Sequence, residues 1–135
     1  MERTATDAEQ RALINHIALY VVNLQTSTQF YKEVIGLEMI PEPFHDGKHT
    51  WFSIGGKAAL HIIAGAPGVE VHRKDSHLCF SVTSVSKFIE QLNQNSIAYE
   101  SATGEKSAVT TRPDGVEQIY FTDPDGFWIE INNAK

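Results

Sequence analysis

Four side chains in this chain of 135 residues have the chemistry to bind a metal or to move a proton. His16, His61, His77 and Glu130 each stand in a short stretch where apolar and polar residues alternate. Because side chains alternate between the two faces of a strand, each donor is predicted to lie opposite the apolar row of its own stretch. Three imidazoles and a carboxylate suit Zn²⁺, Ni²⁺, Co²⁺, Mn²⁺ or Fe²⁺. If the donor faces meet, the sequence predicts a divalent metal site and leaves the identity of the metal open.

The stretches that carry these donors belong to a unit that occurs twice, and each unit is predicted to be a strand, a helix and three further strands. Strands are expected at residues 14–22, 37–44, 49–54 and 58–63 in the first unit, and at 76–82, 97–101, 117–122 and 127–132 in the second. Asn23 and Ser84 are predicted helix N-caps, and Gly36 and Asn95 the corresponding ends. A longer, mobile loop is expected at residues 103–116. The fold class is therefore α+β, with two βαβββ modules.

The two modules are predicted to form one domain. Its expected limits are residues 13–133, with modules at 13–66 and 74–133 and a disordered segment at 1–12. The net charge of −6 argues against a nucleic-acid partner, which requires a basic face. No apolar run has the length of a membrane span, and the start of the chain has no signal-peptide pattern, so a cytoplasmic location is expected. The single cysteine, Cys79, is predicted to be a small buried apolar residue.

Two segments identify a family. FYKEVIGLEM, after a histidine-bearing strand, and FTDPDGFWIEI, near the end, resemble the glyoxalase I, bleomycin resistance protein and extradiol dioxygenase (vicinal oxygen chelate) superfamily, and the second is most similar to lactoylglutathione lyases. The resemblance implies a cup-shaped mixed sheet with the helices outside, around a divalent metal. It also implies His16, His61, His77 and Glu130 as the four metal ligands, a small-molecule substrate and a homodimer. Sites in such dimers are built within one chain or between two.

For the reaction, the resemblance implies a metal-dependent lyase or isomerase of the glyoxalase I kind. Its substrate would be a small α-oxo or hydroxy-carbonyl compound, including thiol adducts, and the reaction would pass through a metal-bound enediolate. Glu130 would be the general base, and His61, also a candidate catalytic residue, stands at the ligand position where many glyoxalase I enzymes carry a glutamate, so a second carboxylate base is missing. Two alternatives stay open: a fosfomycin-type thiol transferase, for which His16, His77 and Glu130 supply the ligands, and a non-catalytic protein that sequesters an antibiotic or another small molecule. An extradiol dioxygenase is disfavoured by the short chain and the extra ligand His61.

Other side chains are candidates for binding the substrate. Four aromatic residues are predicted either to line a pocket or, equally, to pack in the aromatic core. They are Tyr20, Trp51, Phe121 and Trp128. Arg73 matches a basic position that relatives use for the glutathione carboxylate, and with Arg112 it is a candidate clamp for an anionic substrate. The remaining histidines, His45, His49 and His72, are expected to be solvated.

Overall fold

A computed structural model describes residues 10–135 of the chain. The predicted disordered segment at 1–12 therefore lies almost wholly outside the described residues. The first module contains β1 (His16–Val21), α2 (Leu24–Gln29), η1 (Phe30–Ile35), β2 (Glu38–Ile40), β3 (His49–Ser53) and β4 (Ala59–Ala64). The second contains β5 (His77–Ser81), α3 (Val85–Gln94), β6 (Thr110–Thr111), β7 (Glu117–Thr122) and β8 (Trp128–Asn132).

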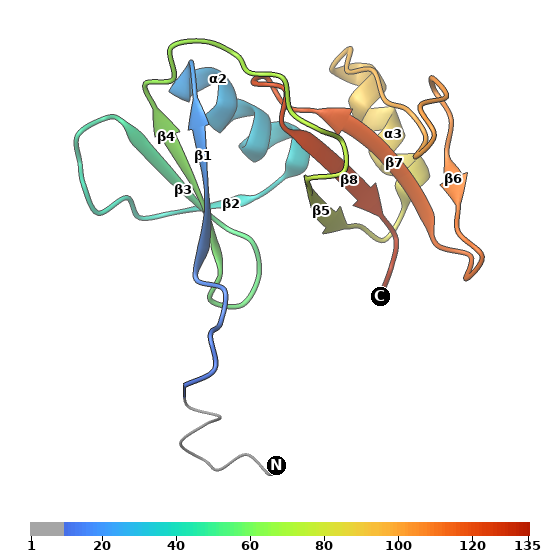
Figure 1. Ribbon diagram of the computed structural model, residues 1–135, viewed down its shortest axis with the longest axis horizontal. Coiled ribbons are helices and arrows are strands. Elements are labelled where there is room, and N and C mark those ends of the chain that lie inside the picture. Colours follow the sequence, from blue (N-terminus) through green and yellow to red (C-terminus); the bar gives the residue numbers. More distant parts are fainter. Residues whose placement is uncertain (1–9) are drawn as a thin grey trace.

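Each module forms its own four-stranded mixed sheet. The strand orders are β1-β4-β3-β2 and β5-β8-β7-β6, so both sheets repeat one topology. In each sheet the first strand runs parallel to the last, and the remaining neighbours are antiparallel. A parallel pair needs a crossover connection, and the helix that follows the first strand begins it. Figure 1 shows the two sheets side by side, with α2 and η1 extending from the left-hand module towards the right-hand one. The predicted α+β class with paired βαβββ modules is confirmed.

The helices begin and end at the residues that the sequence indicates. The Asn23 side chain accepts a hydrogen bond from the Thr26 amide, and the Ser84 side chain accepts one from the Lys87 amide. Gly36 ends the first helix in the left-handed conformation at φ 86°, which a residue with a Cβ adopts at a cost. From Phe30 onwards this helix widens into a π-helix, a feature that the apolar spacing does not predict.

The two modules share one apolar core. The inner rows of β4 and β8 are fully buried, as their parity predicts: Leu60, Ile62, Ile129 and Ile131. Phe30 of η1 packs against Phe121 of β7, with ring centroids 6.3 Å apart, so the helix of the first module contacts the sheet of the second.

The turn Asp123-Pro124-Asp125-Gly126 connects the two modules through hydrogen bonds. The Tyr31 hydroxyl donates to Asp123 Oδ2 at 2.7 Å. Asp125 accepts from the Val22 amide at 2.8 Å and from the Ser27 hydroxyl at 3.2 Å. Both carboxylates are buried, so the turn between β7 and β8 holds the helix of the first module in place.

One predicted strand is wrong. Residues 97–101 form no strand, and only Glu100 pairs, in isolated bridges with Tyr120 and Lys106. The Ser101 amide instead donates to the Glu105 carbonyl and closes a turn, which removes those groups from strand pairing. The edge position is taken instead by β6, inside the predicted loop 103–116.

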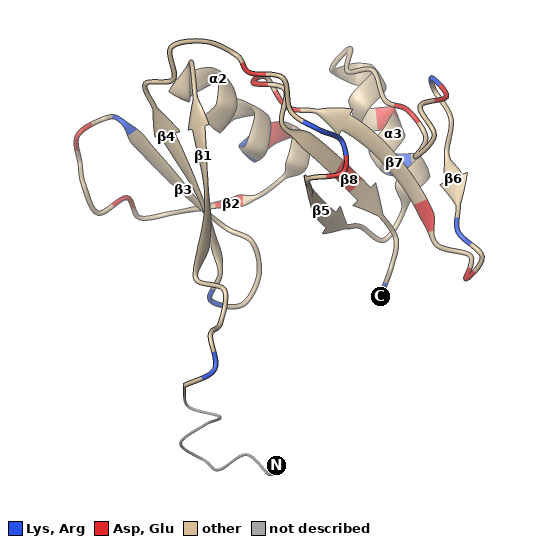
Figure 2. Cartoon of the chain, viewed as in Figure 1, with Lys and Arg blue, Asp and Glu red and all other residues tan. Residues whose placement is uncertain are grey.

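The surface agrees with the charge balance. In Figure 2, acidic and basic positions are interspersed along the loops of the ribbon. Among residues 10–135, no helix is both long and apolar enough to cross a membrane.

Candidate functional site

The first module contributes two of the predicted donors, and they lie on one face of its sheet. In the β1–β4 register, His61 stands opposite Ala18, whose side chain shares a face with that of His16. The two imidazole centroids are 5.8 Å apart, and the Trp51 ring lies 5.2 Å from that of His16. The His16 ring is exposed, and its Nδ1 donates to Asn15 Oδ1 at 2.7 Å. That contact leaves Nε2 of His16 with a free lone pair for a ligand.

His61 has a more enclosed environment than His16. Its ring stacks on Trp51 at 3.9 Å with an interplanar angle of 11°, and it is buried. Burial, followed by the nearby imidazoles of His49 and His16, lowers the pKa of His61 from its ordinary value. His61 is therefore held in the neutral form that both a ligand and a base require.

His49 is a site residue that the sequence did not reveal. We expected a solvated histidine, but His49 begins β3 and is half-buried, and its Nδ1 lies 2.7 Å from Nε2 of His61. On its other side, Nε2 of His49 lies 3.6 Å from the Asp46 carboxylate. The signal was present in the alternation of β3, because His49 and Trp51 share a face two residues apart.

The second module contributes the other two donors in direct contact. Nε2 of His77 lies 3.1 Å from Oε1 of Glu130. Glu130 is buried and accepts hydrogen bonds from Gln118, Tyr120 and Asn132 at 2.8–2.9 Å. Burial by itself raises the pKa of Glu130, but hydrogen bonds from Asn132, Gln118, Tyr120 and Cys79 together lower it below its ordinary value. Glu130 is therefore an ionised carboxylate near neutral pH.

The pair fits a cation. Nδ1 of His77 donates to the Lys74 carbonyl at 2.8 Å, so this nitrogen carries the proton. In a neutral ring the Nε2 lone pair then faces a carboxylate oxygen at 3.1 Å, which is repulsive unless a positive charge lies between them or on the ring. A histidine whose other nitrogen donates to a backbone carbonyl is the usual arrangement of a metal ligand.

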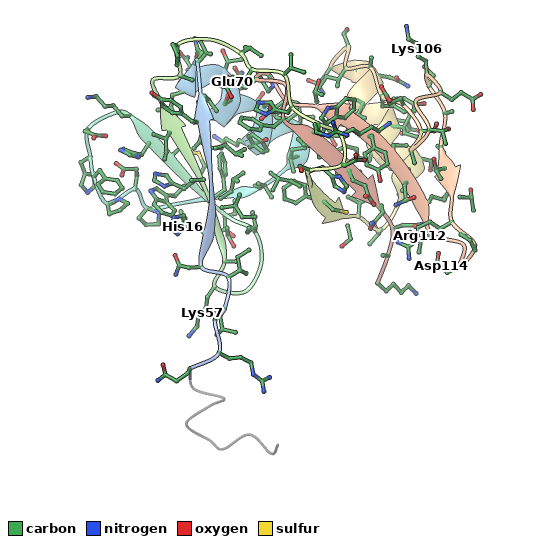
Figure 3. All side chains as sticks on the ribbon, viewed as in Figure 1. His16, Lys57, Glu70, Lys106, Arg112 and Asp114 are labelled. Carbon is green, nitrogen blue, oxygen red and sulfur yellow. The ribbon has the colours of Figure 1, made fainter. Side chains whose placement is uncertain are left out.

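The four predicted ligands form two pairs in one chain and no common cluster. Among residues 10–135, no group of three or more histidine, cysteine, aspartate or glutamate side chains is close enough to hold a metal. In Figure 3, His16 lies on β1 in the left-hand module, whereas Lys106, Arg112 and Asp114 mark the far edge of the right-hand one. Each module thus carries one pair of the predicted donors, His16 with His61 and His77 with Glu130.

The predicted substrate-binding residues have different surroundings. Tyr20 is half-exposed, donates to the Gly65 carbonyl at 2.7 Å and lines a cavity of about 290 Å³ at the module junction. Trp128 is half-buried, and its indole N–H donates to the His72 carbonyl at 3.2 Å. Phe121 is in the core, the alternative that we gave for it. Arg73 is almost fully exposed and lies 3.5 Å from Asp75.

Two further side chains complete the description of these faces. Trp51 stacks on His61, and its indole N–H is buried with no hydrogen-bond partner among the described residues. The prediction for Cys79 is wrong: it is exposed, because β5 is an edge strand and Cys79 shares the outer face with His77. The sulfur itself is shielded from water, since it accepts from the Asn132 amide at 3.2 Å, and this burial, followed by the neighbouring Glu130 carboxylate, raises the pKa of the thiol to about 12.

Known proteins share this architecture along almost the whole chain. The chain is 28% identical over 128 residues to Glyoxylase I 4 of Arabidopsis thaliana, and the aligned region covers 90% of this chain and 70% of the relative. It is 27% identical over 130 residues to metallothiol transferase FosB of Staphylococcus epidermidis, spanning 90% and 81%.

Solved structures match the fold. FosX, a fosfomycin resistance protein of Listeria monocytogenes, matches with a TM-score of 0.72 and 22% identity over 93% of this chain and 96% of its own. A lactoylglutathione lyase of Agrobacterium tumefaciens matches with a TM-score of 0.66 and 20% identity, covering 93% and 96%. The family model described as Glyoxalase/Bleomycin resistance protein/Dioxygenase superfamily matches residues 13–131. The doubled module and this match establish that the chain belongs to that superfamily.

Proposed function

We propose that the chain is a metal-dependent enzyme of the glyoxalase I type, a lyase or isomerase of a small α-oxo or hydroxy-carbonyl compound. The observation that carries the proposal is the His77–Glu130 pair, in which a buried ionised carboxylate faces the imidazole nitrogen that the Lys74 carbonyl leaves free. Relatives named glyoxylase I and metallothiol transferase support an enzyme of this superfamily.

We propose further that the complete site forms between two chains of a homodimer. The outer faces of β1 and β5 are exposed in the single chain, and each carries a histidine of one half-site: His16 and His77. A twofold dimer that joins the first module of one chain to the second module of its partner would assemble four donors, and would do so twice. The half-sites would then be His16 with His61 from one protomer, and His77 with Glu130 from the other.

In this proposal the donor side chains have two roles, metal binding and proton transfer. His16, His77 and Glu130 would hold the metal, and His61 would become a fourth ligand only on release of its Nε2 from His49. A bound divalent cation would supply Lewis-acid stabilisation of negative charge on the substrate oxygens. Glu130 already accepts from three side chains besides facing His77, so it suits the role of a ligand, and it is a weak base in this state. His61, neutral and hydrogen-bonded to His49, is the second candidate to take the proton from the carbon beside the carbonyl.

The fosfomycin-type thiol transfer is the second candidate, and one observation favours it. Nε2 of His61 is engaged by His49, which leaves His16, His77 and Glu130 as a two-histidine, one-glutamate set. This is the set that resemblance to fosfomycin-modifying relatives implies.

Metal binding and turnover separate these possibilities. Purified protein reconstituted with Ni²⁺, Co²⁺, Zn²⁺, Mn²⁺ or Fe²⁺ is assayed with hemithioacetals of methylglyoxal and, separately, for thiol addition to fosfomycin. We expect hemithioacetal turnover, lost in His77→Ala and Glu130→Gln and retained in the control Glu38→Gln, an exposed residue of β2. Thiol addition alone would establish the second candidate. No stoichiometric metal and no turnover would leave a small-molecule binding protein.

A mixing experiment tests the shared site. His16→Ala/His61→Ala and His77→Ala/Glu130→Gln chains are each expected to bind no metal. When the two variant chains are mixed and reassociate at random, half of the dimers are hybrids, and each hybrid has one intact site. The mixture should therefore bind roughly a quarter of the metal that the wild type binds. No recovery from verified hybrid dimers would show that the site does not form between chains.

A further inference from the structure

We infer that Lys74 is a positioning residue that fixes both members of the His77–Glu130 pair. The expected effect of Lys74 on metal binding rests on the function proposed above, whereas its contacts with the protein do not depend on that proposal. Lys74 lies in the segment that joins the modules, three residues before His77, and no sequence pattern marked it.

The Lys74 ammonium is held on several sides at once. It donates to Oε2 of Glu100 at 2.7 Å and to the Ser101 carbonyl at 2.7 Å. It also lies 4.8 Å from the ring centroid of Tyr120 and 5.3 Å from that of Trp128. The Lys74 and Glu100 side chains are each less than a third exposed, so this pair is more shielded from water than a surface ion pair. One side chain thus joins the inter-module segment, the loop after Glu100 and the sheet of the second module.

Two connections lead from this ammonium to the donor pair. Lys74 supplies the backbone carbonyl that accepts from Nδ1 of His77, so fixing its side chain also fixes the acceptor that directs Nε2 towards Glu130. Lys74 also lies over the ring of Tyr120, whose hydroxyl donates to Oε1 of Glu130 at 2.8 Å. The Tyr120 backbone is in turn paired with Glu100 through two hydrogen bonds of 2.8 Å. His77 and Glu130 are therefore held by a common anchor.

The loop itself is built to hold this charge. The Ser101 carbonyl that accepts from Lys74 belongs to a turn closed by the Gly104 amide at 3.0 Å, and the buried Ser101 hydroxyl accepts from the Glu105 amide at 3.0 Å. These two hydrogen bonds fix the turn, so the Ser101 carbonyl stays beside the Glu100 carboxylate, where both accept from the Lys74 ammonium. A methionine at position 74 would keep most of the apolar length and lose both hydrogen bonds of the ammonium, whereas Glu100→Gln would remove only the negative charge.

The chain offers matched controls for both substitutions. Lys106 is an exposed lysine in the same loop, and its side chain makes no hydrogen bond or ion pair within residues 10–135. Glu105 is an exposed glutamate of that loop, and only its backbone is hydrogen-bonded in the part of the chain that the structure describes. The Lys106 backbone bridges Glu100 and the Glu105 backbone is bonded to Ser101, but neither side chain contacts the ammonium through a hydrogen bond. Lys106→Met and Glu105→Gln therefore repeat the chemical changes and leave the hydrogen bonds of Lys74 in place.

The test measures the His77 ring without metal and then the affinity for Co²⁺ alone. In ¹⁵N-histidine-labelled protein, the hydrogen-bonded Nδ1 proton of His77 is followed by NMR, and Co²⁺ is then titrated by visible absorption. In Lys74→Met we expect exchange of this proton with water to be at least about tenfold faster and Co²⁺ to bind about 10- to 100-fold more weakly, as for loss of other groups that orient metal ligands. Glu100→Gln should move both quantities in the same direction by less, and the two controls should match the wild type.

The outcomes separate this inference from the proposed function. If folded Lys74→Met and Glu100→Gln proteins keep the wild-type exchange rate and Co²⁺ affinity, Lys74 does not position the pair. If the wild type itself fails to bind Co²⁺, the metal function fails, and the exchange rate of the His77 proton in the two variants still decides the role of Lys74.

Discussion

Replacing Tyr31 with phenylalanine removes one hydroxyl from the junction between the modules and leaves the ring in place. Tyr31 is fully buried, and burial, with the Asp123 carboxylate as the next cause, raises its pKa well above the ordinary value. The phenol is therefore a hydrogen-bond donor at every working pH. Its 2.7 Å bond to Asp123 is short, as expected for a hydroxyl that donates to a carboxylate.

The expected loss follows from what remains around Asp123. A hydrogen bond to a charged group contributes about 1.5–3 kcal/mol, and the ring leaves no cavity. Asp123 keeps the amides of Asp125 and Phe127 as donors to Oδ1, each at 2.9 Å, whereas Oδ2 loses the donor that the Tyr31 hydroxyl supplies. We therefore expect Tyr31→Phe to lower the free energy of unfolding by about 2 kcal/mol.

Urea unfolding followed by tryptophan fluorescence measures this loss. Tyr99→Phe is the matched control, because Tyr99 packs against the same core and its hydroxyl makes no hydrogen bond among the described residues. The control should stay within about 0.5 kcal/mol of the wild type. If Tyr31→Phe lowers the free energy of unfolding by less than about 0.5 kcal/mol, or if both variants lower it equally, the Tyr31–Asp123 hydrogen bond does not stabilise the contact between the modules.

Three further predictions concern the turns, the thiol and the buried acid. Gly36→Ala should lower the free energy of unfolding by about 1 kcal/mol, because φ is 86° at this helix end; an unchanged urea midpoint would contradict this. Cys79, although exposed, should react with iodoacetamide at pH 8 about 10³-fold more slowly than a free cysteine, because a pKa of about 12 leaves little thiolate; a rate near that of free cysteine would contradict it. The depressed pKa of Glu130 adds stability that is present above its ordinary value of 4.5 and is lost as the pH falls through the folded-state value. The difference in unfolding free energy between wild type and Glu130→Gln should thus shrink below pH 4.5, and a difference independent of pH would show that the carboxylate is not stabilised in its ionised form.

The sequence predicted local features well because they depend on neighbouring residues. The helix caps at Asn23 and Ser84 and the face on which each donor lies follow from side-chain chemistry and strand alternation. The buried rows of β4 and β8 follow from the same alternation. The fold class then followed from finding the unit twice.

Features that depend on distant partners could not be predicted in this way. Residues 97–101 have strand-forming types, but their backbone groups are used in a turn that the Lys74 ammonium contacts from another segment. His49 of β3 contacts His61 of the neighbouring strand β4, and although alternation gives the face of His49, the register of the two strands is needed to bring the rings together. The separation of the donors into two pairs arises from the placement of the first helix against the second sheet, a contact between residues about ninety positions apart.

The turn at residues 123–126 gives a different meaning to the segment that identifies the family. Its carboxylates hold a tyrosine hydroxyl, a serine hydroxyl and a backbone amide of the first module, and none of these contacts includes the donor pairs. The DPDG segment thus connects the two modules of this chain, and its contacts serve their packing whatever reaction the donor pairs perform. A match to this segment therefore reports how the two modules are joined, whereas the proposed chemistry depends on other residues, at positions 16, 61, 77 and 130.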